Sequence, residues 1–469
     1  MVFSSMVFLF AFVPAVFLLY FLVPQRFKNL VLFIVSLFFY AWGEPRYILL
    51  MLASIGAAYA TGLFADKKKY GKGRATLAAV IAVVWNIGLL LYFKYSDFFV
   101  TNINSIAGTQ LTLPGLALPI GISFYSFQSL SYVIDVYRGE VKPQRNFITL
   151  GTYVALFPQL VAGPIVRYKD IERQLVSRKL NMQQFASGAK RFAVGLAKKA
   201  LLANNIYILF NEINAAPQKD LSVTAVWLAA IAYTFQIYFD FSGYSDMAIG
   251  MGRMLGFEFL ENFDYPYISK SVTEFWRRWH MSLSSWFRDY VYIPLGGNRK
   301  GKARQCLNIL IVWCLTGFWH GANWNFLMWG LYFGIGLLVE KLLLKKLLDK
   351  LPAAVQHIYA LFLIVMGWEI FAYEDTSQLI LNIKRMFGAG GLPLWSAQTG
   401  SWLMQYMPLI AVLILGSTPL IFKLGRTLDR KCETAYQLII EPVCTAAMLF
   451  FSAAYLASSA FNPFLYFRF

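Results

Sequence analysis

Charged residues are scarce in this chain of 469 residues. Asp, Glu, Lys and Arg make up 14% of it, and hydrophobic residues make up 58%. A soluble globular chain typically has about 25% charged and about 45–50% apolar residues. The apolar residues here gather in runs of about 20, which is long enough for a helix to cross a bilayer. Because these runs do not alternate polar and apolar residues, they predict membrane-spanning helices and exclude an outer-membrane barrel.

Cysteine and several well-known catalytic motifs are also rare or absent. The four cysteines have neither CxxC nor metal-ligand spacing, so the sequence predicts no disulfide and no zinc site. It contains no phosphate-binding glycine loop, no GxSxG elbow and no HExxH pair. No basic residue precedes Arg26, so the first apolar run lacks the positive region of a secretory signal. We expect this run to remain as the first span, with the N-terminus outside.

The excess of positive charge does not indicate a nucleic-acid partner. The chain has 42 Lys and Arg against 24 Asp and Glu, a formal net charge of +18. These basic residues cluster between the apolar runs, as in the clusters at 167–199 and 277–304. Cytoplasmic loops of membrane proteins collect such charge and contact anionic headgroups. We therefore expect membrane lipid, and no nucleic acid, among the partners.

The apolar runs predict an all-α polytopic membrane protein with about 11 or 12 transmembrane helices and some re-entrant or interfacial helices. No linker or repeat divides the chain, so residues 1–469 are expected to form a single domain. The segment 253–304 is too polar to span and is amphipathic and aromatic, which predicts interfacial helices on the cytoplasmic surface. The segment 157–166 contains two prolines and a glycine, and it predicts a broken helix that lines protein or water. The expected spans are 6–24, 29–42, 47–65, 75–94, 119–136, 190–211, 222–250, 305–319, 323–344, 356–373, 403–422 and 438–458.

His320 is the strongest candidate for chemistry. It lies between two apolar helical stretches, in a short region that contains the poor helix formers Gly317, Gly321, Asn323 and Asn325. An imidazole at membrane depth is costly to desolvate and can move a proton near neutral pH. The polar break would direct it into a cavity, where it could act as a general base. The structural alternative is a histidine that is hydrogen-bonded between helices.

A second histidine, His280, follows a tryptophan- and arginine-rich run 40 residues earlier. Tryptophan at this density is typical of an interfacial belt, but it could also line a pocket for an acyl chain or an adenine. The arginines nearby would suit a phosphate-bearing donor, although positive-inside bias alone produces similar clusters. The third histidine, His357, has no polar neighbours in sequence and is interpreted as structural. The candidate substrate-binding residues are Trp276, Arg277, Arg278, Arg288, Asp289, Trp319, Asn323 and Gln128.

Three acids fall within or beside apolar segments: Asp135, Asp240 and Asp246. An acid at membrane depth must pair with a cation or line water. We expect them to be structural, buried in salt bridges to Arg277, Arg278 or other basic residues. The alternative role is to orient a histidine.

Four long motifs resemble the membrane-bound O-acyltransferase family, and within it the alginate-type branch that serves bacterial polysaccharide acetylation. The similarity extends over nearly the whole chain, including its ending NPFLYFRF. The motifs are FPQLVAGPIVR at 157–167, EFWRRWHMSLS at 274–284, FRDYVYIPLGG at 287–297 and WHGANWNF at 319–326.

The resemblance implies a helical bundle around a central funnel, with His320 at its floor and His280 as the second polar position. It also implies transfer of an acetyl group from cytoplasmic acetyl-CoA, with no tightly bound cofactor and no metal. A separate extracytoplasmic acetyltransferase would complete delivery to the polysaccharide, and the enzyme would lie in the bacterial inner membrane. His320 would act as general base on the acceptor hydroxyl or accept the acyl group itself, while His280 would position a reactant or relay the proton.

Three other functions remain open at this stage. The sister branch of the family moves D-alanine from a carrier protein to a cell-wall polymer and shares these motifs. A proton-coupled transporter or flippase would use the histidines as a relay, but the inverted repeats typical of such proteins are not evident. A non-catalytic scaffold for a polysaccharide synthase would tolerate replacement of both histidines.

Overall fold

The computed structural model describes residues 2–161 and 163–458, and every regular element in these residues is a helix. Nine helices of this described part are long and apolar enough to cross a membrane, and Phe8–Leu22 is a shorter apolar helix. The prediction of an all-α, multi-pass membrane protein is therefore confirmed. The number of long apolar helices is smaller than the 11 or 12 expected.

The difference in number arises at three expected spans. The span expected at 6–24 is short and divided between η1 (Phe8–Phe12) and α1 (Val13–Leu22). The span expected at 119–136 is α6 (Ile122–Arg138), which has only 17 residues and carries several buried polar side chains, including Gln128 and Asp135. The span expected at 305–319 belongs to α15 (Lys302–His320), whose first turn is charged. Neighbouring protein, rather than lipid, surrounds most of α6.

The chain packs as two compact units. Unit 1 contains Met1–Phe192 and Tyr244–Leu260, and unit 2 contains Ala193–Gly243 and Glu261–Phe469. Two of the boundaries fall inside the helices α10 (Met182–Ala197) and α12 (Val223–Met254), so these two helices contribute to both units. At these two points the chain passes between the units as continuous helix and not through a linker. The single domain stays a prediction.

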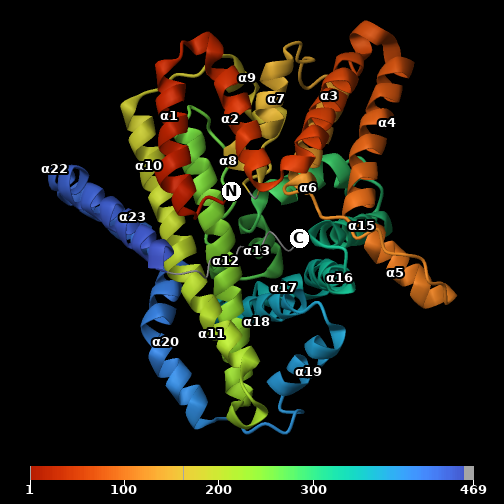
Figure 1. Ribbon diagram of the computed structural model, residues 1–469. Helices are drawn as coiled ribbons and strands as arrows, with labels where there is room; N and C mark the ends of the chain where they lie inside the picture. The colour runs from red at the N-terminus through yellow and green to blue at the C-terminus, as the bar shows by residue number, and fades with distance from the viewer. Residues whose placement is uncertain (1, 162, 459–469) are drawn as a thin grey trace. The chain divides into compact units, whose positions relative to one another are not determined.

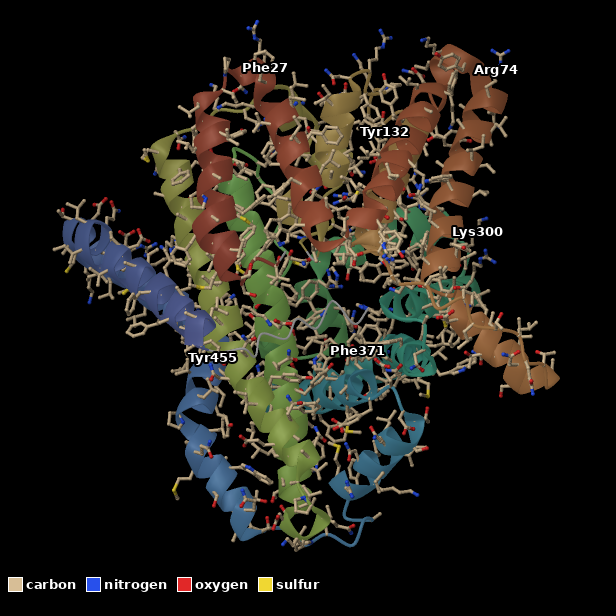
Figure 2. All side chains as sticks on the ribbon, in the orientation of Figure 1. Phe27, Arg74, Tyr132, Lys300, Phe371 and Tyr455 are labelled. Carbon is tan, nitrogen blue, oxygen red and sulfur yellow. The ribbon has the colours of Figure 1, made fainter. Side chains whose placement is uncertain are left out.

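Unit 1 is built around α6. Figure 1 shows α3 and α4 as a pair of long helices, and α6 packs against both of them. A Cβ at Gly62 would lie 2.5 Å from the ring of Tyr132 on α6, so this glycine lets the tyrosine lie against the backbone of α3 (Figure 2). The other helices of unit 1 are η2 (Gln25–Phe27), α2 (Lys28–Gly43), η3 (Pro45–Tyr47), α3 (Ile48–Phe64), α4 (Lys67–Phe93), α5 (Ser96–Ala107), α7 (Phe147–Ala155), α8 (Phe157–Leu160) and α9 (Tyr168–Val176).

The proline-containing segment 157–166 forms the four-residue helix α8, and no regular helix continues into the described residues 163–166. Phe157 and Gln159 are buried, and Gln159 Nε2 donates to the carbonyl of Tyr153. The prediction of a broken helix is confirmed. This segment lies against protein, one of the two environments that tolerate irregular backbone at membrane depth.

Unit 2 contains a large aromatic core. Trp276 packs edge-on against Trp313, with ring centroids 4.6 Å apart, and Trp279 packs against Trp368 at 4.7 Å. The helices of unit 2, besides the end of α10, the first part of α12 and α15, are η4 (Lys198–Ala203), α11 (Asn204–Ala215), η5 (Gln218–Asp220), η6 (Pro266–Ile268), α13 (Val272–Arg278), α14 (Met281–Phe287), η7 (Arg288–Tyr292), α16 (Trp324–Val339), η8 (Glu340–Leu344), α17 (Lys345–Leu348), α18 (Ala353–Ala372), α19 (Thr376–Met386), α20 (Ala397–Gly416), α21 (Leu420–Lys431), α22 (Glu433–Ala435), η9 (Tyr436–Ile440) and α23 (Glu441–Ser458).

The segment 253–304 packs aromatic side chains into the protein core, and its position at the cytoplasmic surface stays a prediction. Its helices α13 and α14 are only seven residues long, and Phe275, Trp276 and Trp279 are buried in the core of unit 2. The aromatic face of α13 covers protein, because the other helices of unit 2 supply a matching aromatic surface.

Candidate active site

The α15–α16 hairpin positions His320, which is the last residue of α15. The two helices cross with almost no space between their backbones. A Cβ at Gly317 would lie 2.2 Å from the carbonyl oxygen of Phe326, and one at Gly330 would lie 2.3 Å from that of Trp313. Only glycine permits this approach, because backbone cannot move aside as a flexible side chain can. The crossing fixes the end of α15, and with it the histidine, three residues after Gly317.

Aromatic rings surround the imidazole of His320. Its centroid lies 5.0 Å from Trp319, 5.0 Å from Trp329 and 5.4 Å from Phe371, each ring roughly perpendicular to it. The side chain is 6% exposed. Phe371 comes from α18, which packs against α16 (Figure 2).

His280 occupies the junction between α13 and α14 in a left-handed backbone conformation, with φ 44° and ψ 52°. Among the described residues, only Tyr265 and His280 are non-glycine residues with positive φ. This conformation costs about 1–2 kcal/mol for an L-residue, so the surrounding contacts must hold it in place. Its imidazole is 2% exposed and lies 4.7 Å, centroid to centroid, from the ring of Phe241.

The two histidines share one neighbour, Trp319. The centroid of Trp319 is 6.2 Å from that of His280 and 5.0 Å from that of His320. Trp276 joins the same cluster through Trp329, at a centroid distance of 5.5 Å. Four residues predicted from the sequence, His280, His320, Trp319 and Trp276, are thus brought together within unit 2.

Asn262 holds the His280 junction. The carbonyl of Asn262 accepts a hydrogen bond from Met281 N at 3.0 Å. Its side-chain Oδ1 accepts from Ser282 N at 3.2 Å and from Ser282 Oγ at 2.8 Å, and it lies 3.2 Å from His280 Nδ1. A second backbone hydrogen bond, from Asp264 N to the carbonyl of Arg278 at 2.9 Å, joins the same two segments of the chain. Burial lowers the pKa of His280 to about 3, so the imidazole is neutral at physiological pH.

The N-terminus of α13 is held by Glu340, a buried acid that the sequence did not single out. Its carboxylate accepts from Val272 N at 2.6 Å, from Thr273 N at 2.9 Å and from Thr273 Oγ1 at 2.7 Å. A carboxylate at a helix N-terminus satisfies backbone donors that have no partner within the helix. Glu340 therefore fixes the helix that carries Trp276 towards the junction at His280.

The remaining candidate binding residues do not join this cluster through any contact described. Asn323 caps α16, with its Oδ1 accepting from Trp324 N at 2.7 Å. Arg288 pairs with its neighbour Asp289 at 2.8 Å and is 62% exposed. Gln128 is fully buried in unit 1.

The two arginines of the tryptophan-rich run differ in exposure and in their partners. Arg277 is exposed. Arg278 pairs with Asp264 at 2.7 Å and with Glu274 at 3.0 Å. His357, interpreted from the sequence as lacking polar neighbours, has its Nδ1 3.1 Å from the carbonyl of Ser269.

The three acids are ion-paired, as expected, and their partners are basic residues other than Arg277 and Arg278. Asp240 lies 2.6 Å from Lys199, and Asp246 lies 2.8 Å from Arg191. Asp135 lies 4.0 Å from Lys169. These partners belong to α10, η4 and α9, which sequence separation alone could not have selected. Within the described residues, no group of three or more His, Cys, Asp or Glu side chains could hold a metal ion.

Sequence reasoning missed Asn262 and Ser282, which fix His280, and Phe371, which flanks His320. Trp329, which also flanks His320, belongs to the tryptophan-rich region that the sequence indicated. Ser282 stood inside a motif already noted, two residues after the histidine. Asn262 precedes His280 by 18 residues in a loop, and no periodicity links it to the site. Its role depends on tertiary contacts alone.

Known proteins resemble this chain over all or most of its length. The sequence profile of the membrane-bound O-acyltransferase family matches residues 140–371, which include both histidines of the site. The chain is 38% identical to the probable alginate O-acetylase of Azotobacter vinelandii, over 100% of each chain. It is 42% identical to the probable alginate O-acetylase of Pseudomonas aeruginosa, over 83% of this chain and 75% of that protein. It is 33% identical to the peptidoglycan O-acetyltransferase of Helicobacter pylori, over 84% of this chain and 81% of that protein.

Proposed function

Because this chain belongs to the membrane-bound O-acyltransferase family, in its alginate O-acetylase branch, we propose that it transfers an acetyl group from cytoplasmic acetyl-CoA across the membrane. The acetyl group serves O-acetylation of an extracytoplasmic polysaccharide such as alginate. A separate extracytoplasmic acetyltransferase completes the delivery. The enzyme acts in the bacterial inner membrane.

His320 is the general base of this reaction. It takes the proton of the acceptor hydroxyl as the hydroxyl oxygen attacks the carbonyl carbon of the acetyl thioester. The carbon–sulfur bond then breaks, and the proton passes from His320 to the departing CoA thiolate. The observation that carries this role is the pair of buried imidazoles sharing Trp319 in the family-matched region. A base of this kind typically contributes about 10²–10⁴-fold to the rate.

Exposed basic residues of unit 2 suit a donor that carries phosphates. Arg277, Arg299 and Lys300 are exposed, as are Lys302 and Arg304 at the start of α15. Such a group attracts an anionic ligand and raises its local concentration. These basic residues would also attract anionic lipid. They are therefore weaker evidence for acetyl-CoA as the donor than the two histidines are for acyl transfer.

The test is acetyl transfer by the purified protein in vesicles, measured as acetyl-CoA consumed and CoA thiol released. His320→Ala should reduce the rate by about 10²–10⁴-fold while the protein remains folded and inserted. His357→Gln is the matched control, because its ring contacts a backbone carbonyl outside the aromatic cluster. Near-normal transfer by folded His320→Ala would overturn the proposed role.

The same assay separates the other functions. Transfer from a D-alanyl carrier protein, with no consumption of acetyl-CoA, would indicate the D-alanyl branch. Movement of acetyl-CoA or glycan without thioester cleavage would indicate a transporter. A scaffold predicts that His280→Ala and His320→Ala both retain polysaccharide acetylation in cells.

A further inference from the structure

The hydrogen bonds at Asn262 determine which nitrogen of His280 carries the proton. Ser282 N is a backbone donor, so the atom of Asn262 that lies 3.2 Å from it must be the carboxamide oxygen Oδ1 and not the amide nitrogen. The same Oδ1 lies 3.2 Å from His280 Nδ1. Ser282 Oγ also lies 3.4 Å from Nδ1, but its hydroxyl donates to the same Oδ1 at 2.8 Å. Because Oδ1 only accepts, Nδ1 must be the donor. The neutral imidazole is therefore protonated on Nδ1, and its Nε2 carries the lone pair.

The other end of the ring has no such partner. His280 Nε2 is buried, and no described residue forms a hydrogen bond with it. The side chain is 2% exposed, so bulk water does not serve it. A buried acceptor without a hydrogen bond is costly, and natural proteins retain one mainly where it has a function. Its position beside Trp319, which also contacts His320, indicates that a reactant meets it there.

Hydrogen bonds also fix the backbone at His280. Its left-handed conformation is unfavourable for an L-residue, and Asn262 fixes both residues that follow it, through Met281 N and Ser282 N. Strain of this kind at a buried polar residue points to a functional constraint on its orientation. One residue, Asn262, thus sets both the direction of the ring and its tautomer.

We propose that Asn262 is a positioning residue that holds His280 as the Nδ1-protonated tautomer, so that Nε2 accepts a hydrogen bond from an N–H or O–H group of a substrate. This inference rests on the proposed function and assigns His280 a role that the sequence left open. In this role the neutral His280 accepts a hydrogen bond from the substrate through Nε2. It does not donate to the oxyanion of the tetrahedral intermediate, because Nε2 has no proton to give.

The direct test is nitrogen-15 NMR of the protein labelled at histidine, reconstituted in vesicles. The chain has three histidines, so His320→Gln and His357→Gln assign the signals. Protonated and lone-pair nitrogens of a neutral imidazole have well-separated shifts. We expect His280 to show a protonated Nδ1 and an unprotonated Nε2. A protonated Nε2 in the wild-type protein would overturn the proposal.

Variants of Asn262 supply the kinetic test. Asn262→Leu removes the acceptor, so we expect a mixture of tautomers and a kcat/KM for acetyl-CoA about ten-fold lower, the effect of losing about one hydrogen bond. Ser284→Ala is the control, because the side chain of Ser284 is exposed on α14 and the bond between Asn262 and His280 stays in place. It should keep the tautomer and stay within about three-fold of wild type, a change smaller than one full hydrogen bond.

Asn262→Asp tests whether Asn262 positions His280 or is merely structural. It also provides the test if Asn262→Leu fails to fold. A carboxylate keeps the acceptor for Nδ1 but stabilises the imidazolium, so His280 should now protonate at higher pH. Protonation turns Nε2 into a donor, so the activity of this variant should begin to fall at a higher pH than the activity of wild type, whose acid limb reports the general base His320. An unchanged pH profile in folded Asn262→Asp would overturn the proposal. Activity of His320→Ala would instead overturn the proposed function, so the two failures are distinguishable.

Discussion

Lys199 Nζ lies 2.6 Å from Asp240 Oδ1, and the two side chains are 2% and 1% exposed. The pair joins η4 to α12 within unit 2. Lys199 lies in a π-helical turn, Lys198–Ala203, where one extra residue per turn changes which side chains face inward. A buried ion pair is sensitive to the loss of one partner, because the remaining charge is left in a medium that solvates it poorly.

Replacing one member of this pair should be strongly destabilising. Lys199→Met is expected to lower the free energy of unfolding by about 3–5 kcal/mol, and Lys199→Met with Asp240→Leu by much less. Chemical denaturation in detergent, arranged as a double-mutant cycle, measures the coupling. The exposed pair Arg288–Asp289 is the comparison: Arg288→Met should cost less than about 1 kcal/mol. Equal losses at the two pairs would contradict this account.

The Gly317–Gly330 crossing makes a second prediction. Gly317→Ala would place a Cβ 2.2 Å from the carbonyl oxygen of Phe326, so the two helices must separate and carry His320 with them. We expect a loss of at least about 1–3 kcal/mol in stability, as for overpacking in a core, together with lower acetyl transfer. Gly336→Ala, on α16 with no atom within 4 Å of its Cβ, is the matched control and should be neutral or slightly stabilising. Comparable defects in both variants would show that the close crossing at Gly317 is not the cause of the effect.

The site could be predicted from the sequence where its signals are local. His320 stands in a cluster of poor helix formers between two apolar stretches, and the structure places it at the end of α15, where that helix breaks before α16 begins. Trp319 and Trp276 were found in the same way, as members of a dense tryptophan region. These residues share a short stretch of chain, so composition alone was enough to select them.

The contacts between distant parts of the chain could not be predicted. Lys199 and Asp240 lie 41 residues apart on different elements, and Asn262 reaches His280 across a loop that contains α13. No periodicity relates such residues. Amphipathic helices that meet lipid and those that meet an aromatic protein core have the same pattern. The burial of Phe275 and Trp279 in the core of unit 2 therefore could not be predicted from the sequence of 253–304.

Acid should destabilise the protein through His280. Burial lowers the pKa of His280 from 6.5 to about 3, so between these values the unfolded chain binds a proton that the folded chain does not. The free energy of unfolding therefore keeps its full value above pH 6.5, as far as His280 is concerned, and decreases as the pH falls from 6.5 towards 3. Between pH 7 and pH 5 this one group should remove about 2 kcal/mol from the free energy of unfolding, since each unit of pH is worth about 1.4 kcal/mol within the window.

His280→Asn isolates this contribution, because it removes the titrating ring and leaves every other acid and base in place. We expect the variant to be less stable than wild type at pH 7 but to lose about 2 kcal/mol less on going to pH 5, measured by denaturation in detergent at both pH values. Ser284→Ala changes an exposed side chain on α14 and retains the imidazole and its bond to Asn262, so it should keep the wild-type slope. Parallel slopes for wild type and His280→Asn would mean that water or a charge reaches the ring in the folded state, and the neutral, buried His280 on which the site depends would have to be given up.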